Sequence, residues 1–298
     1  MLPEEILDYI LSLCQDVHCL EASTRAHPLL SRIAQKHLYA NIVLHNHTKY
    51  DSYSTQLPLD VGQLSNLLSK RSRIANYVHS LTIETSSNDD DLLPFLEAVP
   101  SILSILPKLR KAELHCPMGQ EFEVYPTLPE SLCLSLEKCV GLPSMKQVLF
   151  RGMEIPSSLL RQCGNAIEKL TIEYCMVYNP DAEVGDSSDA EDSSGGVEDL
   201  SGEVEDSSGE VEDPSDCPTL DKLSIIDVEN QALETLVHCV ASGCRQLSRL
   251  RFTPFDRNMG EPFVLIKPIL VLCSNSLTFL DVDASSLCRS LHYYYFRN

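Results

Sequence analysis

Histidines and cysteines with a spacing that could bind a metal occur at two places in the chain. His45-Asn46-His47 would put both imidazoles on one face of an extended strand, and His238-Cys239 is followed by Cys244. Neither group has the third and fourth ligands that a structural zinc ion requires. We interpret the first as a polar loop and the second as cysteines on the buried face of an amphipathic helix, so the sequence predicts no metal site.

The sequence has no catalytic signature among the residues that carry chemistry. The chain contains no C-x-x-C, no H-E-x-x-H, no glycine-rich phosphate loop and no G-x-S-x-G. Acidic clusters such as Glu203-Val204-Glu205-Asp206 lack the fixed loop and glycine turn of a calcium site. We therefore expect neither an enzyme nor a resident cofactor.

The charge of the chain is concentrated in one segment. The net charge is −20 over 298 residues, but residues 181–216 hold 15 Asp and Glu with no Lys or Arg. The other 28 acids and 23 bases leave a folded part that is only mildly acidic. This composition argues against nucleic acid as a general partner, because phosphate binding needs a basic surface.

Targeting and membrane segments are not expected. The chain runs straight into Leu2-Pro3-Glu4-Glu5 without a basic stretch or a cleavage site, so no signal peptide is predicted. No apolar run approaches the roughly 18 residues of a membrane span. The twelve cysteines lie mostly in apolar surroundings. These features predict a cytoplasmic or nuclear protein without membrane contact, with cysteines in its core.

The N-terminal 45 residues have the pattern of three short helices followed by an extended segment. Two apolar stripes at helical spacing predict a first helix that is covered on two sides; they comprise Leu2, Ile6, Ile10 and Leu13, and Leu7, Leu11 and Cys14. A second helix is expected over 16–25. Pro28 suits the first turn of a third, and 41–44 is an apolar strand.

A repeating triplet, apolar at i, i+3 and i+5, occurs seven times after residue 77. The last two members alternate with polar residues, as in a half-buried strand. Helix-like stretches lie between triplets, for example 91–106, 157–163, 231–242 and 264–273, and one precedes them near 61–73. The triplets are Val78-Leu81-Ile83, Leu109-Ala112-Leu114, Met145-Val148-Phe150, Ile167-Leu170-Ile172, Leu220-Leu223-Ile225, Leu247-Leu250-Phe252 and Leu277-Leu280-Val282.

The expected fold class is α/β: a three-helix N-terminal module followed by an irregular solenoid with parallel strands. One strand–helix unit cannot bury its own apolar face, so neighbouring units must stack. Residues 181–216 repeat a Ser/Gly/Val/acid motif without aromatic residues, which predicts a disordered insertion. The predicted organisation is a module over 1–45, repeats over 46–180, the insertion over 181–216 and further repeats over 217–298.

Leu2-Pro3-Glu4-Glu5-Ile6, then Ile10-Leu11 and a three-helix pattern ending in His37-Leu38-Tyr39, resembles the F-box of fungal proteins. The triplets that follow resemble the degenerate leucine-rich repeats found behind such F-boxes. The resemblance implies a substrate-recognition subunit of an SCF-type ubiquitin ligase, which binds a Skp-family adaptor and through it a cullin. The adaptor-binding residues that it implies are Leu2, Pro3, Ile6, Leu7, Ile10 and Leu11, with Leu20 and Leu38 in support.

The polar positions of the repeats predict a binding face for a target protein. If the strands are parallel and in register, the residues at i+2 form a column: Lys111, Gln147, Lys169, Lys222 and Arg249, flanked by Arg151 and Arg251. Such a column suits an acidic or phosphorylated partner, including the chain's own insertion. Two alternatives remain open here. These residues are ordinary solubilising charges, or the chain is a scaffold without a ligase role, whose N-terminal helices cap the solenoid.

Overall fold

The fold was analysed in a computed structural model of the chain. The structure describes residues 2–14, 16–46, 57–85, 92–116, 127–179, 220–228, 230–254 and 262–282. The acidic segment 181–216, predicted to be a disordered insertion, lies outside these residues.

Nine strands of the described residues form one parallel sheet. Their order is β2-β1-β3-β4-β5-β7-β9-β10-β11, so the sheet follows the chain except that β1 and β2 exchange places. A separate two-stranded pairing joins β6 (Glu154–Pro156) to β8 (Met176–Tyr178). The strands of the large sheet are β1 (Asn41–His45), β2 (Leu57–Leu59), β3 (Ser80–Glu84), β4 (Lys111–His115), β5 (Gln147–Arg151), β7 (Lys169–Glu173), β9 (Lys222–Val228), β10 (Arg249–Pro254) and β11 (Phe279–Val282).

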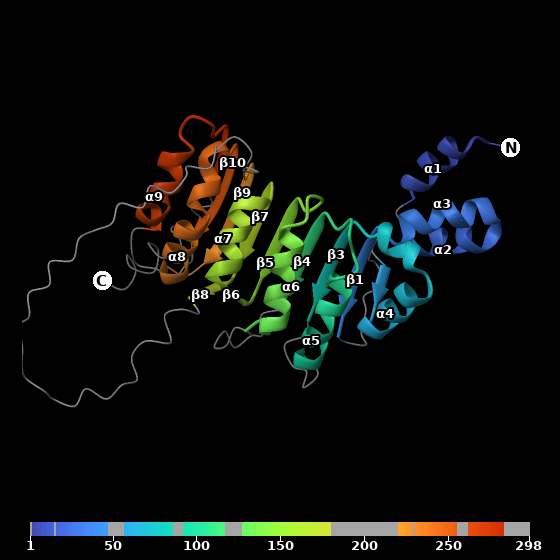
Figure 1. The fold of residues 1–298 in the computed structure, drawn as a ribbon. Helices are drawn as coiled ribbons and strands as arrows, with labels where there is room; N and C mark the ends of the chain where they lie inside the picture. Colours follow the sequence, from blue (N-terminus) through green and yellow to red (C-terminus); the bar gives the residue numbers. More distant parts are fainter. Residues whose placement is uncertain are drawn as a thin grey trace, which may run out of the picture.

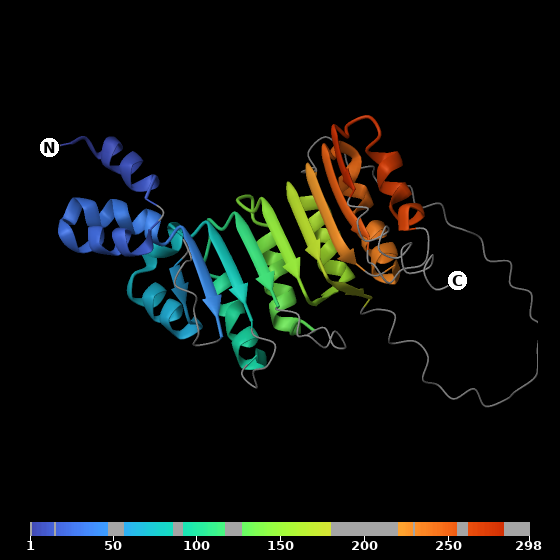
Figure 2. The same cartoon turned by 180° about the vertical axis from the view of Figure 1, so that it is seen from behind.

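Helices cover one face of this sheet, and the other face carries no described helix (Figure 1, Figure 2). Beneath the helices lie the second and fourth residues of the triplet-bearing strands from β3 to β10; in β7, for example, Leu170 and Ile172 are fully buried. The elements on the covered face are α4 (Val61–Lys70) with the 3-10 turn η1 (Ser72–Asn76), α5 (Leu92–Leu103), α6 (Glu130–Val140), α7 (Ser157–Ala166), α8 (Asn230–Val240) with the 3-10 turn η3 (Ala241–Gln246), and α9 (Pro262–Leu272).

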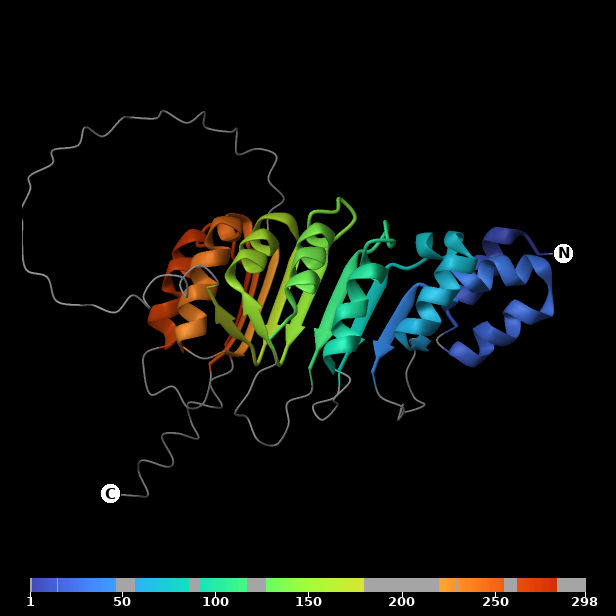
Figure 3. The same cartoon turned by 60° about the horizontal axis from the view of Figure 1, so that its bottom comes forward.

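The N-terminal module consists of α1 (Glu4–Ser12), α2 (Val17–Ala26) and α3 (Pro28–Leu38), and it lies at the β2 end of the sheet (Figure 3). It has its own apolar core, which includes Leu20, Ile33 and Leu38. Tyr39 and Leu59 contact both this core and the large core of the body. The two parts are therefore joined by continuous packing.

The expected α/β class with parallel strands is confirmed, and a three-helix module is present as expected. The strand at 41–45, which the sequence analysis grouped with the module, pairs with β3 and β2 inside the sheet. The helical module therefore ends at Leu38. Helix α6, β2 and the β6–β8 pairing were not expected from the sequence; the strands β2, β6 and β8 have three residues each and lack the triplet.

Candidate protein-binding surfaces

The first helix presents a row of large apolar side chains to solvent. The exposed fractions are 46% for Ile6, 50% for Ile10 and 54% for Leu2, with Tyr9 at 64% and Leu13 at 62%. At 100° per residue Ile6, Tyr9 and Ile10 fall on one side of α1, and Leu2 and Leu13 flank its two ends. An exposed apolar row of this kind is a candidate surface for interaction with another molecule.

The opposite side of α1 is fixed to α3. Leu11 is buried and Leu7 half-buried in the core of the module. Glu4 pairs with Arg32, and the Asp8 carboxylate lies 2.9 Å from Nε2 of His37. These contacts determine the direction in which the exposed row points.

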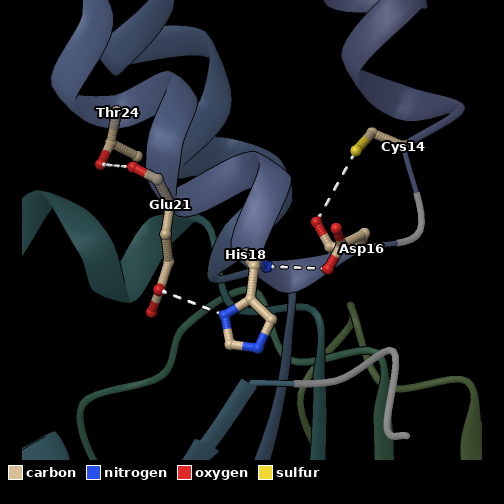
Figure 4. Close-up of polar contacts among 5 residues, drawn as sticks. All are labelled: Cys14, Asp16, His18, Glu21 and Thr24. Atoms are coloured by element: carbon tan, nitrogen blue, oxygen red, sulfur yellow. Dashed lines mark hydrogen bonds and ion pairs between the residues drawn. The ribbon is translucent and has the colours of Figure 1, made fainter.

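The turn from α1 into α2 is closed by local hydrogen bonds (Figure 4). The Cys14 thiol donates to the backbone carbonyl of Asp16 over 3.6 Å, and the Asp16 carboxylate accepts from the backbone N–H of His18 at 3.0 Å. The second bond is an N-cap, which satisfies one of the free N–H groups at the start of α2. Two further contacts involve Glu21 in α2. Its carboxylate pairs with His18, and its backbone carbonyl accepts a hydrogen bond from the hydroxyl of Thr24.

The residues implied for adaptor binding thus fall into two groups. Four are exposed, namely Leu2, Pro3, Ile6 and Ile10, and Leu7 is half-buried. The other three are buried in the module: Leu11, Leu20 and Leu38. In this structure the three buried residues cannot contact a partner directly, and they act only by packing beneath the exposed row. Tyr9 and Leu13, which were not among the implied contacts, extend it.

The open face of the sheet brings the basic residues of the strands into one column. Lys111 pairs in register with Gln147, Gln147 with Lys169, Lys169 with Lys222, and Lys222 with Arg249. Neighbouring strands lie roughly 4.8 Å apart. The structure therefore assembles the column at the first position of β4, β5, β7, β9 and β10.

Some of these cations are neutralised by acids on the same face. Nζ of Lys111 lies 2.7 Å from Glu113, and Arg151 and Arg251 lie 3.5 Å from Glu173 and Asp281 respectively. Lys222 lies 3.6 Å from Asp221, just before β9. Among the described residues Lys169 and Arg249 form no ion pair.

The least neutralised part of the open face spans β7, β9 and β10. Here Lys169, Lys222 and Arg249 occupy the first column, and Thr171, Ser224 and Arg251 occupy the next column in register. These four cations and two hydroxyls form a grid of hydrogen-bond donors, in which Lys222 and Arg251 are each paired with an acid and Thr171 is only 6% exposed. Such a grid can bind an anionic segment of another protein.

The metal candidates of the sequence analysis do not converge. His238 is exposed on α8, whereas Cys239 and Cys244 are buried. Burial raises the pKa of Cys244 to about 12. Of the His45-Asn46-His47 group, His47 lies outside the described residues. Within the described ranges no three His, Cys, Asp or Glu residues are grouped so that they could hold a metal ion.

No protein-family model and no curated protein matches this chain.

Among the helices of the described residues, none combines the length and the apolar character that crossing a membrane requires.

Proposed function

We propose that this protein is a substrate receptor of an SCF-type ubiquitin ligase. The observation that carries the proposal is the exposed apolar row on α1, formed by Leu2, Ile6, Tyr9, Ile10 and Leu13. These side chains lie on α1 or at its ends, and the other side of this helix is fixed to its own module. An apolar helix face of this kind binds in a groove or against helices of a partner. A Skp-family adaptor, bridged to a cullin, is the partner that the F-box resemblance implies.

The body is proposed to be a leucine-rich-repeat-like solenoid. Support comes from the repetition of its units, since equivalent backbone bonds recur before each strand. Lys146 N donates to Arg110 O at 2.8 Å, Glu168 N to Lys146 O at 3.0 Å and Ser248 N to Asp221 O at 2.9 Å. Each unit adds one strand in register to the sheet, and its helix packs on the helix of the next unit.

The open face of this body is proposed to bind the target protein. Its donor grid over β7, β9 and β10 suits an acidic or phosphorylated segment of that target. The chain would contribute proximity only, because it holds the target near the ligase subunits that transfer ubiquitin. The proposal places the protein in the cytoplasm or the nucleus, where such ligases act.

The experiment is affinity purification of the tagged full-length chain from cells, with adaptor and cullin measured by quantitative mass spectrometry. We expect both in the wild-type sample and neither in the Ile6→Asp/Ile10→Asp variant, because two buried charges would cost several kcal/mol at a desolvated interface. Ser12→Asp is the matched control, since Ser12 is exposed on the flank of the same helix. Adaptor at equal levels in wild type and double variant would refute the assignment.

A scaffold without a ligase role is the second candidate function. The observation in its favour is the continuous packing through Tyr39 and Leu59, which makes the module a cover for the β2 end of the sheet. A cap of this kind keeps the end of a repeat array soluble. In that case the purification would contain target proteins but no adaptor or cullin.

A further inference from the structure

A cavity of about 710 Å³ lies where the N-terminal module meets the body. Its walls come from the end of α2, from α3, and from the junction between α4 and η1. The lining side chains are all polar or charged: Thr24, Arg25, Ser31, Gln35, Lys70, Arg71, Ser72 and Arg73. Four of these eight residues are cations, and none is an acid.

The inner wall of the cavity is a short chain of hydrogen bonds. Gln35 is only 6% exposed, and its amide oxygen accepts from Nη2 of Arg73 at 3.1 Å. Its amide nitrogen donates to Oγ of Ser31 at 3.3 Å. The guanidinium has five N–H donors, so Arg73 can hold Gln35 and still donate into the cavity. This wall is therefore fixed and rich in donors.

The cations of the cavity are not neutralised within the described part of the chain. Arg25, Lys70, Arg71 and Arg73 form no ion pair there. The carboxylate of Glu21 does not line the cavity and forms its ion pair with His18. The C-terminal ends of α2 and α4 offset part of this charge, by roughly half an elementary charge each. About three positive charges remain.

We propose that this cavity binds a small sugar or polyol that carries two phosphate groups. Each phosphate brings a charge of about −1.5 to −2 at neutral pH, so two match the remaining positive charge and one does not. The volume lies within the range of small-molecule sites, roughly 300–1,000 Å³. The lining offers no aromatic ring to stack on a base and little apolar surface, which favours a polyol over a nucleotide.

Such a ligand would connect the module to the body. Arg25 and Ser31 belong to the module, and Lys70, Arg71 and Arg73 belong to the body. Phosphate oxygens shared between the two sets would fix the angle between the module and the body. Bound ligand would also stabilise the folded state by mass action. This inference does not depend on the proposed function.

The test is calorimetric titration of the full-length protein with fructose 1,6-bisphosphate at low salt, together with its thermal unfolding. We expect saturable binding at one site, a midpoint of unfolding that rises with ligand concentration, and weaker binding in high salt. The Lys70→Gln/Arg71→Gln variant should bind roughly ten- to a hundredfold more weakly, because it loses two charge-assisted contacts. Both side chains are exposed, so its unliganded stability should match the wild type.

The matched control is Lys108→Gln/Arg110→Gln, which removes the same charge from exposed positions outside the cavity. Its affinity should equal that of the wild type. Equal weakening in both variants would overturn the proposal, and so would the absence of heat and of a stability change at millimolar ligand. Inorganic phosphate binding as tightly as the bisphosphate would contradict the two-phosphate class. Binding confined to vesicles with phosphatidylinositol 4,5-bisphosphate would contradict a soluble ligand.

Discussion

Cysteine acts in this chain mainly as a small apolar residue. Ten cysteines lie in the described residues, all are free, and eight of them are buried. Burial raises the pKa of Cys133 and Cys139 to about 11 and that of Cys175 to about 12. Such thiols stay protonated at neutral pH and are poor nucleophiles. This accounts for cysteines at positions that pack against leucine and isoleucine.

Alkylation should therefore separate the cysteines by environment. In native protein treated with iodoacetamide at pH 8, we expect Cys19 to react well before Cys163 and Cys175, which should react only after denaturation. Cys19 is exposed, although a hydrogen bond with Cys14 raises its pKa, whereas Cys163 and Cys175 are buried. Peptide mapping by mass spectrometry gives the rates. Rapid labelling of Cys163 in folded protein would contradict this packing.

Single residues of the binding surfaces were predictable to different degrees. The column on the open face followed from the sequence, because strand alternation and parallel pairing leave only one arrangement once the register is known. The exposed row on α1 followed in part, and Tyr9 was not among the residues of the two apolar stripes. The cavity could not be foreseen. Arg25 and Arg73 are far apart in sequence, and only the docking of the module on the body brings them together.

The two sides of the first helix should differ in how much a substitution changes the stability of the fold. The Ile6→Asp/Ile10→Asp variant should unfold within about 0.5 kcal/mol of the wild type, because both side chains already face solvent. Leu11→Asp in the same helix should be destabilised by several kcal/mol, since Leu11 is only 7% exposed. Urea denaturation followed by circular dichroism measures both. A loss above about 2 kcal/mol in the double variant would mean that the chain itself covers this face.

The sheet should tolerate removal of most of the acidic segment. Strand β7 pairs directly with β9 through five residues in register, so the described strands on either side of residues 180–219 are neighbours in the sheet. Deleting 186–212 should change the free energy of unfolding by less than about 1 kcal/mol, because loop-closure entropy varies slowly with length. Calorimetric unfolding checks this. A decrease of more than about 2 kcal/mol would show that the segment makes stabilising contacts.

Strands were easier to predict than the remaining elements. Each of the seven triplets marks a strand in the structure, because period-two alternation beside a buried first residue is a strong local signal. Helix α6 was not singled out, although Leu132 and Leu136 are buried at helical spacing. The three residues of β2 carry too little pattern, and their strand state depends on pairing with β1. The local sequence therefore determines the repeated strands, whereas the edge strand β2 depends on its tertiary pairing.

The molecule as a whole presents two surfaces in a fixed relation. The row on α1 and the open face of the sheet lie on parts that share packing through Tyr39 and Leu59. In the proposed function the protein contributes only proximity between target and ligase. The adaptor-binding row and the target-binding face must therefore keep a constant relative position. A ligand bound in the cavity at the junction would further fix the position of the N-terminal module on the body. Binding of the adaptor to the α1 row is therefore the central step of the proposed function.

The direct measurement is isothermal titration calorimetry of the purified full-length chain with a recombinant Skp-family adaptor, repeated at several temperatures. The account predicts saturable one-to-one binding with a negative heat-capacity change, as expected when apolar surface is buried. It also predicts that Ile6→Asp/Ile10→Asp weakens binding by more than about a hundredfold, which corresponds to roughly 3 kcal/mol, while Ser12→Asp does not. Absence of binding by the folded wild-type protein, or equal affinity in the double variant, would contradict the account.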